Sequence, residues 1–220
     1  MMNYVFCAYR KWALEIFDVL NKKYDNFFLI KNPKQLTYKK IKKIDPKFIF
    51  FPDWSWMVPG KIFQNFDCVC FHEADLPKFR GGSPLQNQII RGLEKTKTTA
   101  FLMNEKMDGG PIIMKRPLSL KGGISEIIER MKKNDLEIID KILSDKFTVT
   151  KQIGRSSTFK RRKPEDSEIS LNHSKKYLYN FIRMLEDPYP NAFLNLGNHK
   201  IIFKQAEFKN NKLSVETVIE

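Results

Sequence analysis

Short apolar runs alternate with helix-like stretches over the first 143 residues. Apolar, β-favouring runs predict strands at residues 3–8, 27–30, 48–51, 68–71, 98–103 and 112–118. Apolar residues at helical spacing predict helices at residues 13–21, 38–43 and 124–143, and another helical run begins near Leu85. Strands that alternate with helices indicate a doubly wound, mostly parallel sheet.

The pattern changes beyond residue 143. Residues 147–154 are compatible with a linker strand, residues 174–185 form an amphipathic helical pattern, and short strand patterns such as residues 200–204 follow. We therefore predict an α/β fold in two parts. A main domain covers residues 1–150, and a small C-terminal α+β appendage with a helix and short strands covers residues 151–220.

One stretch concentrates features of a binding site. Residues 68–87 read CVCFHEADLPKFRGGSPLQN, so that His72 ends a buried strand and a loop with two glycines opens the next helix. Ligands of open α/β sheets bind outside the carboxyl ends of the strands. Glycine permits unusual backbone angles and close approach of a ligand. We therefore expect chemistry at this strand end.

Three blocks carry a resemblance to one enzyme family. His72 followed by LPKFRGG at residues 76–82 resembles N-x-H-x-S-L-L-P-x-x-R-G, the signature loop of the N10-formyltetrahydrofolate-dependent formyltransferases. MNEKMDGGPII at residues 103–113 resembles their M-x-x-x-L-D-x-G segment, and residues 159–193 are similar to their R-x-x-P-E-D-S-x-I and D-P-(Y/W)-P-G-A-F segments. Blocks in one order over most of residues 48–205 specify a family far better than a single motif does. The resemblance implies a Rossmann-like catalytic domain over residues 1–150 and N10-formyltetrahydrofolate as formyl donor.

The resemblance assigns the catalytic positions, with one departure. It places the catalytic pair at His72 and Asp108. Histidine can accept and return a proton near neutral pH, and a nearby carboxylate fixes its tautomer and raises its basicity. The family has an asparagine two residues before the histidine, where this chain has Cys70. A thiol is a weak hydrogen-bond partner, so either another donor replaces the amide or the chain has lost activity.

Further residues are candidates around this pair. Glu73 and Asp75 are either solvated loop charges or participants in catalysis. Arg10 and Lys11, at a strand-to-helix junction, are either phosphate ligands or an ordinary charged loop. The predicted donor site comprises Trp56, Met57, Val58, Leu76, Arg80, Gly81 and Met107, and the predicted acceptor site comprises Arg10, Lys11, Gln86 and Asn87.

Composition sets the class of protein. Hydrophobic residues make up 42% and aromatic residues 13% of the chain, as in globular proteins. No apolar run approaches the roughly 20 residues of a membrane helix, and the N-terminus lacks the layout of a signal peptide, so we expect a cytoplasmic enzyme. Cys7, Cys68 and Cys70 fall in strand-like runs without further ligands at metal-site spacing, so no metal is predicted.

The acceptor of the formyl group is the least determined feature. The net charge of +14 has three interpretations: a nucleic-acid partner, attraction for any anionic ligand, or a compositional bias without function. The short chain, the DPYPNAF block and the variant loop at residues 71–87 favour a nucleotide-linked 4-amino sugar used for surface glycans. On this interpretation nucleic acid is an unlikely partner, and a homodimer is an option. Methionyl-tRNA formyltransferase is the alternative, followed by a catalytically degenerate homologue that only binds folate or nucleotide.

Overall fold

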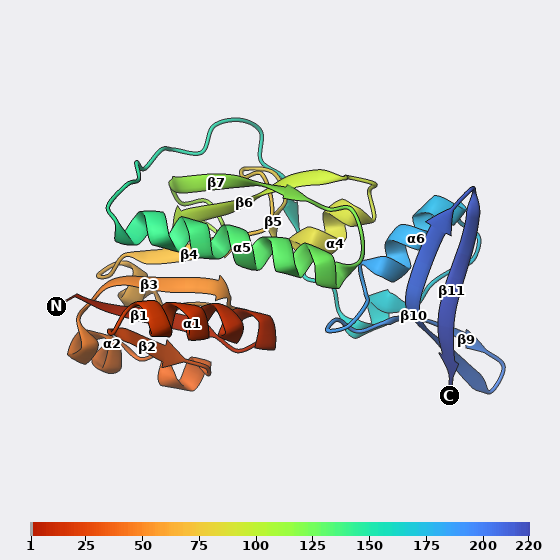
Figure 1. The fold of residues 1–220 in the computed structure, drawn as a ribbon, viewed down its shortest axis with the longest axis horizontal. Coiled ribbons are helices and arrows are strands. Elements are labelled where there is room, and N and C mark those ends of the chain that lie inside the picture. The colour runs from red at the N-terminus through yellow and green to blue at the C-terminus, as the bar shows by residue number, and fades with distance from the viewer. Residues whose placement is uncertain (1) are drawn as a thin grey trace.

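A central sheet carries the first two thirds of the chain (Figure 1). The computed structural model describes residues 2–220. Its elements are β1 (Asn3–Ala8), α1 (Lys11–Lys23), β2 (Phe27–Ile30), η1 (Pro33–Gln35), α2 (Tyr38–Ile44), β3 (Pro46–Asp53), α3 (Gly60–Phe63), β4 (Cys68–His72), β5 (Arg80–Gly81), α4 (Pro84–Ile89), β6 (Lys95–Leu102), β7 (Ile112–Ser119), α5 (Ile124–Leu143), β8 (Thr158–Phe159), η2 (Pro164–Ser167), α6 (Lys175–Arg183), β9 (Ala192–Leu196), β10 (His199–Lys209) and β11 (Lys212–Ile219).

The six-stranded sheet confirms the predicted fold class. Its strand order is β2-β1-β3-β4-β6-β7. The first four strands run parallel to one another, whereas β6 is antiparallel to both β4 and β7. The sheet is therefore mostly parallel, and one of its edges is an antiparallel hairpin.

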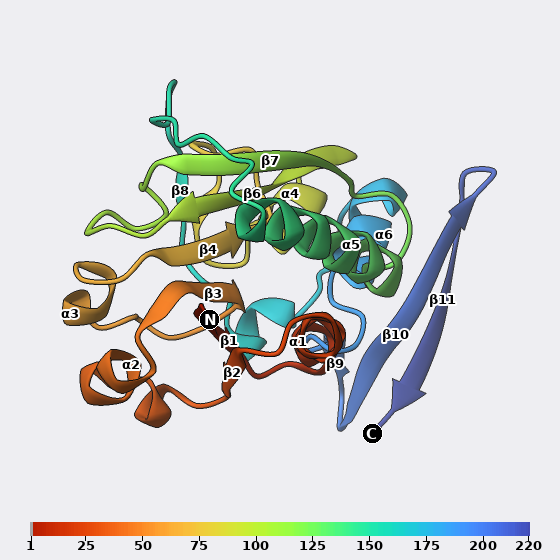
Figure 2. The ribbon, with the colours of Figure 1, turned by 60° about the vertical axis from the view of Figure 1, so that its left-hand side comes forward.

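Helices cover both faces of the sheet because their apolar stripes match its two faces. Helix α5 buries one stripe that includes Ile127, Met131 and Ile138, and α1 buries Ile16 and Leu20 beside it. These residues belong to one large core, while α2 and α3 pack with a second, smaller core on the opposite face. Figure 2 shows α1 and α5 on one side of the sheet and α2 and α3 on the other.

The start of α5 has a cap that the sequence pattern did not reveal. The Glu126 carboxylate accepts a hydrogen bond from the Gly123 backbone amide at 2.9 Å. The Glu186 carboxylate accepts another from the Ile124 amide at 3.0 Å. Both carboxylates satisfy amides that a helix start leaves unpaired, and Glu186 ties α5 to the C-terminal part of the chain.

The chain after α5 departs from the prediction and then returns to the centre of the molecule. The expected linker strand at residues 147–154 is wrong, because only Thr150 forms an isolated bridge, to Ile112. β8 then pairs in parallel with β5, beside the carboxyl ends of the central strands. A three-stranded antiparallel sheet, β11-β10-β9, packs against α6 and ends the chain (Figure 1). The division of the chain at residue 150 stays a prediction.

Within residues 2–220, no helix combines the length and the apolar character that crossing a membrane requires.

Candidate active site

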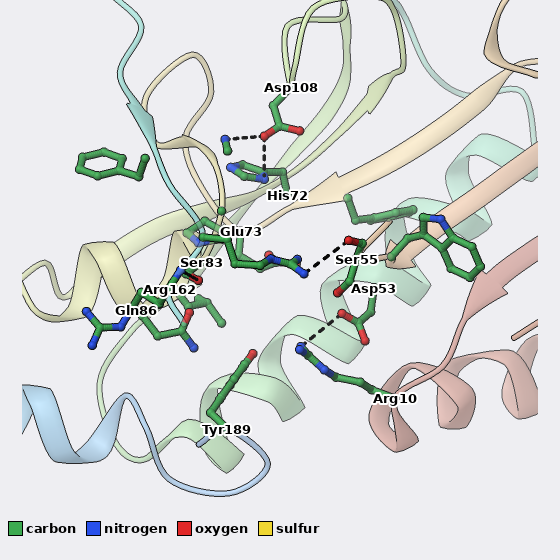
Figure 3. A pocket seen from close by; sticks show the side chains of 18 of the residues that line it. Arg10, Asp53, Ser55, His72, Glu73, Ser83, Gln86, Asp108, Arg162 and Tyr189 are labelled. Carbon is green, nitrogen blue, oxygen red and sulfur yellow. Dashed lines mark hydrogen bonds and ion pairs between the residues drawn. The ribbon is translucent and has the colours of Figure 1, made fainter. Parts of the chain in front are cut away.

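A cavity of about 630 Å³ opens at the carboxyl ends of β1, β3 and β4 (Figure 3). This is the edge at which open α/β sheets bind their ligands. Of the residues predicted from the sequence, nine line the cavity: Arg10, Trp56, Met57, Cys70, His72, Gly81, Gln86, Met107 and Asp108. Glu73, one of the two flanking carboxylates, also lines it.

His72 is the buried end of β4, and its two ring nitrogens have different partners. Nε2 lies 2.7 Å from the backbone carbonyl oxygen of Phe79. A carbonyl only accepts, so Nε2 carries the proton and donates it. Nδ1 is then left with its lone pair, 3.7 Å from Oδ2 of Asp108. The structure therefore presents one nitrogen of His72 for proton transfer.

Asp108 occupies a tightly held turn between β6 and β7. Its Oδ2 accepts a hydrogen bond from the Gly81 amide at 2.6 Å, and its backbone has a left-handed φ of 47°. The Gln152 side chain donates to the carbonyl oxygens of Asp108 and Gly110, both at 2.8 Å. Left-handed backbone at a non-glycine residue is costly and persists where the surroundings fix it. The carboxylate is thus locked against His72.

Arg80 supports this turn from outside the cavity. Its Nη2 donates to Oε1 of Gln152 at 2.6 Å, and Gln152 in turn holds the Asp108 turn. Arg80 does not line the cavity. Arg80, which the sequence analysis assigned to the donor site, therefore contacts the Asp108 turn through Gln152.

Four other predicted residues also lie away from the cavity, each for a clear reason. Val58 is buried in the smaller core with α2 and α3. Leu76 is 1% exposed and lines a separate surface pocket. The Asn87 amide donates to the carbonyls of Gly82 and Ser83, and Lys11 is exposed at the start of α1.

Cys70 lines the cavity as a neutral thiol. Burial, reinforced by the negative charge of Asp108, raises the pKa of Cys70 well above its ordinary value. Its Sγ lies 3.7 Å from the carbonyl oxygen of Phe71, which is a weak contact. Cys70 therefore offers neither a thiolate nor the strong donor of an amide.

The loop that faces His72 and Asp108 is fixed by the returning chain. The rings of Phe79 and Phe159 stack at 5.1 Å. A Cβ at Gly82 would lie 2.2 Å from Cα of Arg161, so only glycine permits this approach. Phe79 and Ser83 have left-handed φ values of 57° and 52°. Residues beyond α5 thus complete the cavity.

One wall of the cavity is aromatic. The rings of Trp54 and Trp56 meet at 5.0 Å, and Tyr9 meets Trp56 at 4.7 Å. Met57 and Met107 stand at the rim, 77% and 54% exposed. The rings are tilted by 68° and 58° to one another, so this wall presents both ring faces and ring edges to the cavity.

A neighbouring part of the cavity wall is polar and rich in carboxylates. Arg10 lies 3.4 Å from Asp53 and 5.2 Å from the ring centre of Tyr189. Burial raises the pKa of Asp53 although Arg10 opposes the shift, and burial raises the pKa of Glu73 to about 8. Glu73 is therefore not a solvated loop charge. Asp75 is, since it pairs with Lys115 at 2.5 Å and Lys97 at 3.3 Å outside the cavity.

Sequence reasoning missed several residues of the cavity wall. They are Trp12, Asp53, Trp54, Ser83, Arg161, Arg162 and Tyr189. Asp53 had a signal, because it ends β3 at the same edge of the sheet as His72. Arg161 and Arg162 belong to the one dense basic run, and Tyr189 to the DPYP turn. Their approach to the cavity depends on the return of the chain.

Family comparisons cover most of the chain. Residues 19–143 match the model described as "Formyl transferase", and residues 164–220 match "Methionyl-tRNA formyltransferase, C-terminal domain". The solved structure of methionyl-tRNA formyltransferase from Clostridium thermocellum is 40% identical, with a TM-score of 0.95 over 100% of this chain and 99% of that one.

More distant relatives differ in extent. The methionyl-tRNA formyltransferase of Campylobacter jejuni is 31% identical over 72% of this chain and 53% of its own length. The chain thus spans about half the length of the curated relatives it matches. A 4-N formyltransferase from Francisella tularensis is 17% identical, with a TM-score of 0.70 over 95% of this chain and 99% of that one, which shows a shared fold.

The predicted acceptor, a nucleotide-linked amino sugar, is contradicted by these comparisons. The relatives at 40% and 31% identity are methionyl-tRNA formyltransferases. The sugar N-formyltransferase structures are only 17% identical to this chain, which shows a shared fold and no more. The short chain was a poor guide, because the structure at 40% identity is matched over nearly its whole length.

Proposed function

The chain belongs to the formyl transferase family, and from that membership we propose that it transfers a formyl group from N10-formyltetrahydrofolate to the amine of methionyl-tRNA. The observation that carries the proposal is the 40% identity to a methionyl-tRNA formyltransferase over the whole chain. The cavity with its buried His72–Asp108 pair supports the same reaction.

The cavity suits a folate donor. Trp54 and Trp56 give the cavity an aromatic wall for a planar ring. Some polar atoms of the lining residues have no hydrogen-bond partner within residues 2–220, namely the indole nitrogens of Trp12 and Trp54 and one carboxylate oxygen of Asp53. The donor, when bound, supplies a formyl group on a nitrogen leaving group. Trp54, Trp56 and Met107 would hold its ring near His72.

His72 and Asp108 can manage protons during the transfer. The lone pair on Nδ1 of His72 can accept a proton and return it during the reaction. The Asp108 carboxylate at 3.7 Å stabilises the imidazolium that forms. The Phe79 carbonyl holds the opposite nitrogen, so the imidazole keeps one orientation throughout. Proton transfer of this kind contributes roughly 100- to 10,000-fold to a rate.

Charge near the cavity favours a nucleic-acid acceptor. Arg161, Arg162 and Lys163 line the cavity, and the chain carries a net charge of +14. Basic side chains at a site mouth attract a phosphate backbone. Under this proposal a nucleic acid is the expected partner, contrary to the expectation from the sequence.

The test is formylation of charged initiator tRNA with N10-formyltetrahydrofolate, measured by the release of tetrahydrofolate. We expect turnover with methionyl-tRNA, none with uncharged tRNA, and an affinity for tRNA that falls steeply as salt rises. A protein that binds folate but never formylates methionyl-tRNA would refute the proposal. That outcome would favour the degenerate homologue that Cys70 suggests.

A further inference from the structure

Glu73 is a carboxylate of the cavity wall that the His72–Asp108 pair leaves unused. It lines the cavity, and the only hydrogen bond its carboxylate accepts within residues 2–220 comes from its own backbone amide. A carboxylate has acceptor sites on both oxygens. Glu73 therefore has free acceptor capacity facing the space where substrates bind (Figure 3).

Glu73 approaches the cavity from a different side than His72. Glu73 lies in the bend just after β4, whose last residue is His72, and its carboxylate faces Arg10 and Asp53. His72 instead reaches toward the Asp108 turn. The imidazole of His72 and the carboxylate of Glu73 thus both line the cavity in which the formyl carbon would bind, each with its own neighbours.

We propose that Glu73 is the base that takes the proton from the acceptor nitrogen as this nitrogen adds to the formyl carbon. The assignment rests on the proposed function and divides its two proton transfers between two residues. Glu73 serves the attacking amine, and His72 serves the nitrogen that leaves.

The step balances in atoms and charge. The amine lone pair forms the N–C bond, the C=O π electrons move to oxygen, and one N–H proton passes to the Glu73 carboxylate. The oxygen lone pair then re-forms the C=O bond as the bond from carbon to the leaving nitrogen breaks. The electron pair of the broken bond stays on that nitrogen, which takes one proton from Nδ1 of His72, a proton that Nδ1 has first taken up from water. Glu73 has then gained one proton and His72 has lost one, and exchange with water restores both.

The surroundings keep Glu73 suited to this task. The groups that face it are Arg10 just after β1, Asp53 at the end of β3, the preceding residue His72, Asp108 in the β6–β7 turn, Asp135 of α5, and Tyr189 after α6. Burial, together with the charges of Asp53 and Asp108, raises the pKa of Glu73 to about 8 although Arg10 opposes the shift. An α-amino group has a pKa of about 7.7–8.0. A carboxylate of similar basicity is a far better proton acceptor for such a nitrogen than an ordinary one near 4.3 would be.

The experiment compares pH profiles of methionyl-tRNA formylation for the wild type, Glu73→Gln, Glu73→Asp and Asp75→Asn. Asp75→Asn is the matched control, because it removes a carboxylate from the same loop outside the cavity. We expect Glu73→Gln to lower kcat at pH 8 by about 100-fold or more, with tetrahydrofolate affinity unchanged. Glu73→Asp should recover part of the loss, and Asp75→Asn should stay within about twofold of the wild type, since surface ion pairs contribute little.

The pH profile separates a base from a structural residue. Below about pH 7.5, turnover by the wild type requires that both the acceptor amine and Glu73 lose a proton. The slope of log kcat/KM against pH should therefore be one unit steeper for the wild type than for Glu73→Gln. An unchanged slope, or a Glu73→Gln variant within about threefold of the wild type, would overturn the role of Glu73 alone. A wild type that formylates no methionyl-tRNA at any pH would overturn the proposed function and this role with it.

Discussion

The charge of Asp108 is the perturbation that tests the catalytic pair most directly. Replacing Asp108 by asparagine keeps the shape of the side chain and an oxygen that can accept the Gly81 amide, now 2.6 Å away. The turn itself is held separately by Gln152, which bonds the carbonyls of Asp108 and Gly110. Asp108→Asn therefore removes one negative charge from beside His72 and little else.

The separation of the two groups sets the size of the effect. At 3.7 Å and an effective dielectric constant of about 20, a carboxylate stabilises an imidazolium by about 4 kcal/mol. Both side chains are buried, at 7% and 13% exposed, so solvent screens this attraction little. If an imidazolium forms on the way to the transition state, losing 4 kcal/mol slows the reaction about a thousandfold.

The assay is kcat/KM for formylation of methionyl-tRNA, with tetrahydrofolate affinity and thermal unfolding measured on the same samples. Asp140→Asn is the control, because it removes a carboxylate that pairs with Lys23 at 2.7 Å on the surface, far along α5. We expect Asp140→Asn to leave the rate unchanged. An Asp108→Asn variant that is folded, binds tetrahydrofolate and keeps more than about a tenth of the wild-type rate would refute the electrostatic role of Asp108.

Three further predictions concern the packing around the cavity. Gly82→Ala should lower the melting temperature by several degrees and weaken tetrahydrofolate binding, because its Cβ would meet the backbone of Arg161 at 2.2 Å; Gly60→Ala, whose nearest contact is an ordinary 3.7 Å, is the control and should be neutral in thermal unfolding. Cys70→Asn should keep or raise kcat, since it restores an amide in place of a neutral thiol; a large loss would mean that the thiol, or the space beside it, is part of this site. Asp135→Asn should stabilise the protein increasingly as pH rises, because burial raises the pKa of Asp135 in the folded state. The contribution of Asp135 to stability is complete below its unfolded-state pKa near 3.9. Above that pH it falls by about 1.4 kcal/mol per pH unit until the folded-state pKa is reached. Urea unfolding at pH 5 and pH 8 measures this, and equal differences between variant and wild type at both values would contradict it.

The fold was largely predictable because its signals are local. The helix predicted at residues 124–143 has the same bounds as α5, since its apolar residues recur on one face for its whole length. The antiparallel β6–β7 edge was not predicted, although Gly109 and Gly110 mark the turn that joins these strands. The strand expected at residues 147–154 failed because a short apolar run forms a strand only where a partner is available.

The candidate site was predictable only where the motif blocks assign its residues. Motifs pointed to His72 and Asp108, and the structure brings these two together at 3.7 Å. The same motifs assigned Arg80 to the donor site. In the structure Arg80 instead donates a hydrogen bond to Gln152, a residue 72 positions away. Side-chain partners across such distances depend on the packed fold, which no local pattern reports.

The acceptor was mispredicted because its side of the cavity is assembled from remote segments. Arg10 comes from the first strand end, Arg161 from the returning chain and Tyr189 from the loop after α6, and all three line one cavity with Glu73. The block at residues 159–193 contains Arg161 and Tyr189 but neither Arg10 nor Glu73, so no single block reports the whole wall. Short motifs therefore predict the donor chemistry, whereas the choice of acceptor depends on contacts between remote segments. Under our proposal Glu73 is the residue that links the acceptor to the proton-transfer chemistry.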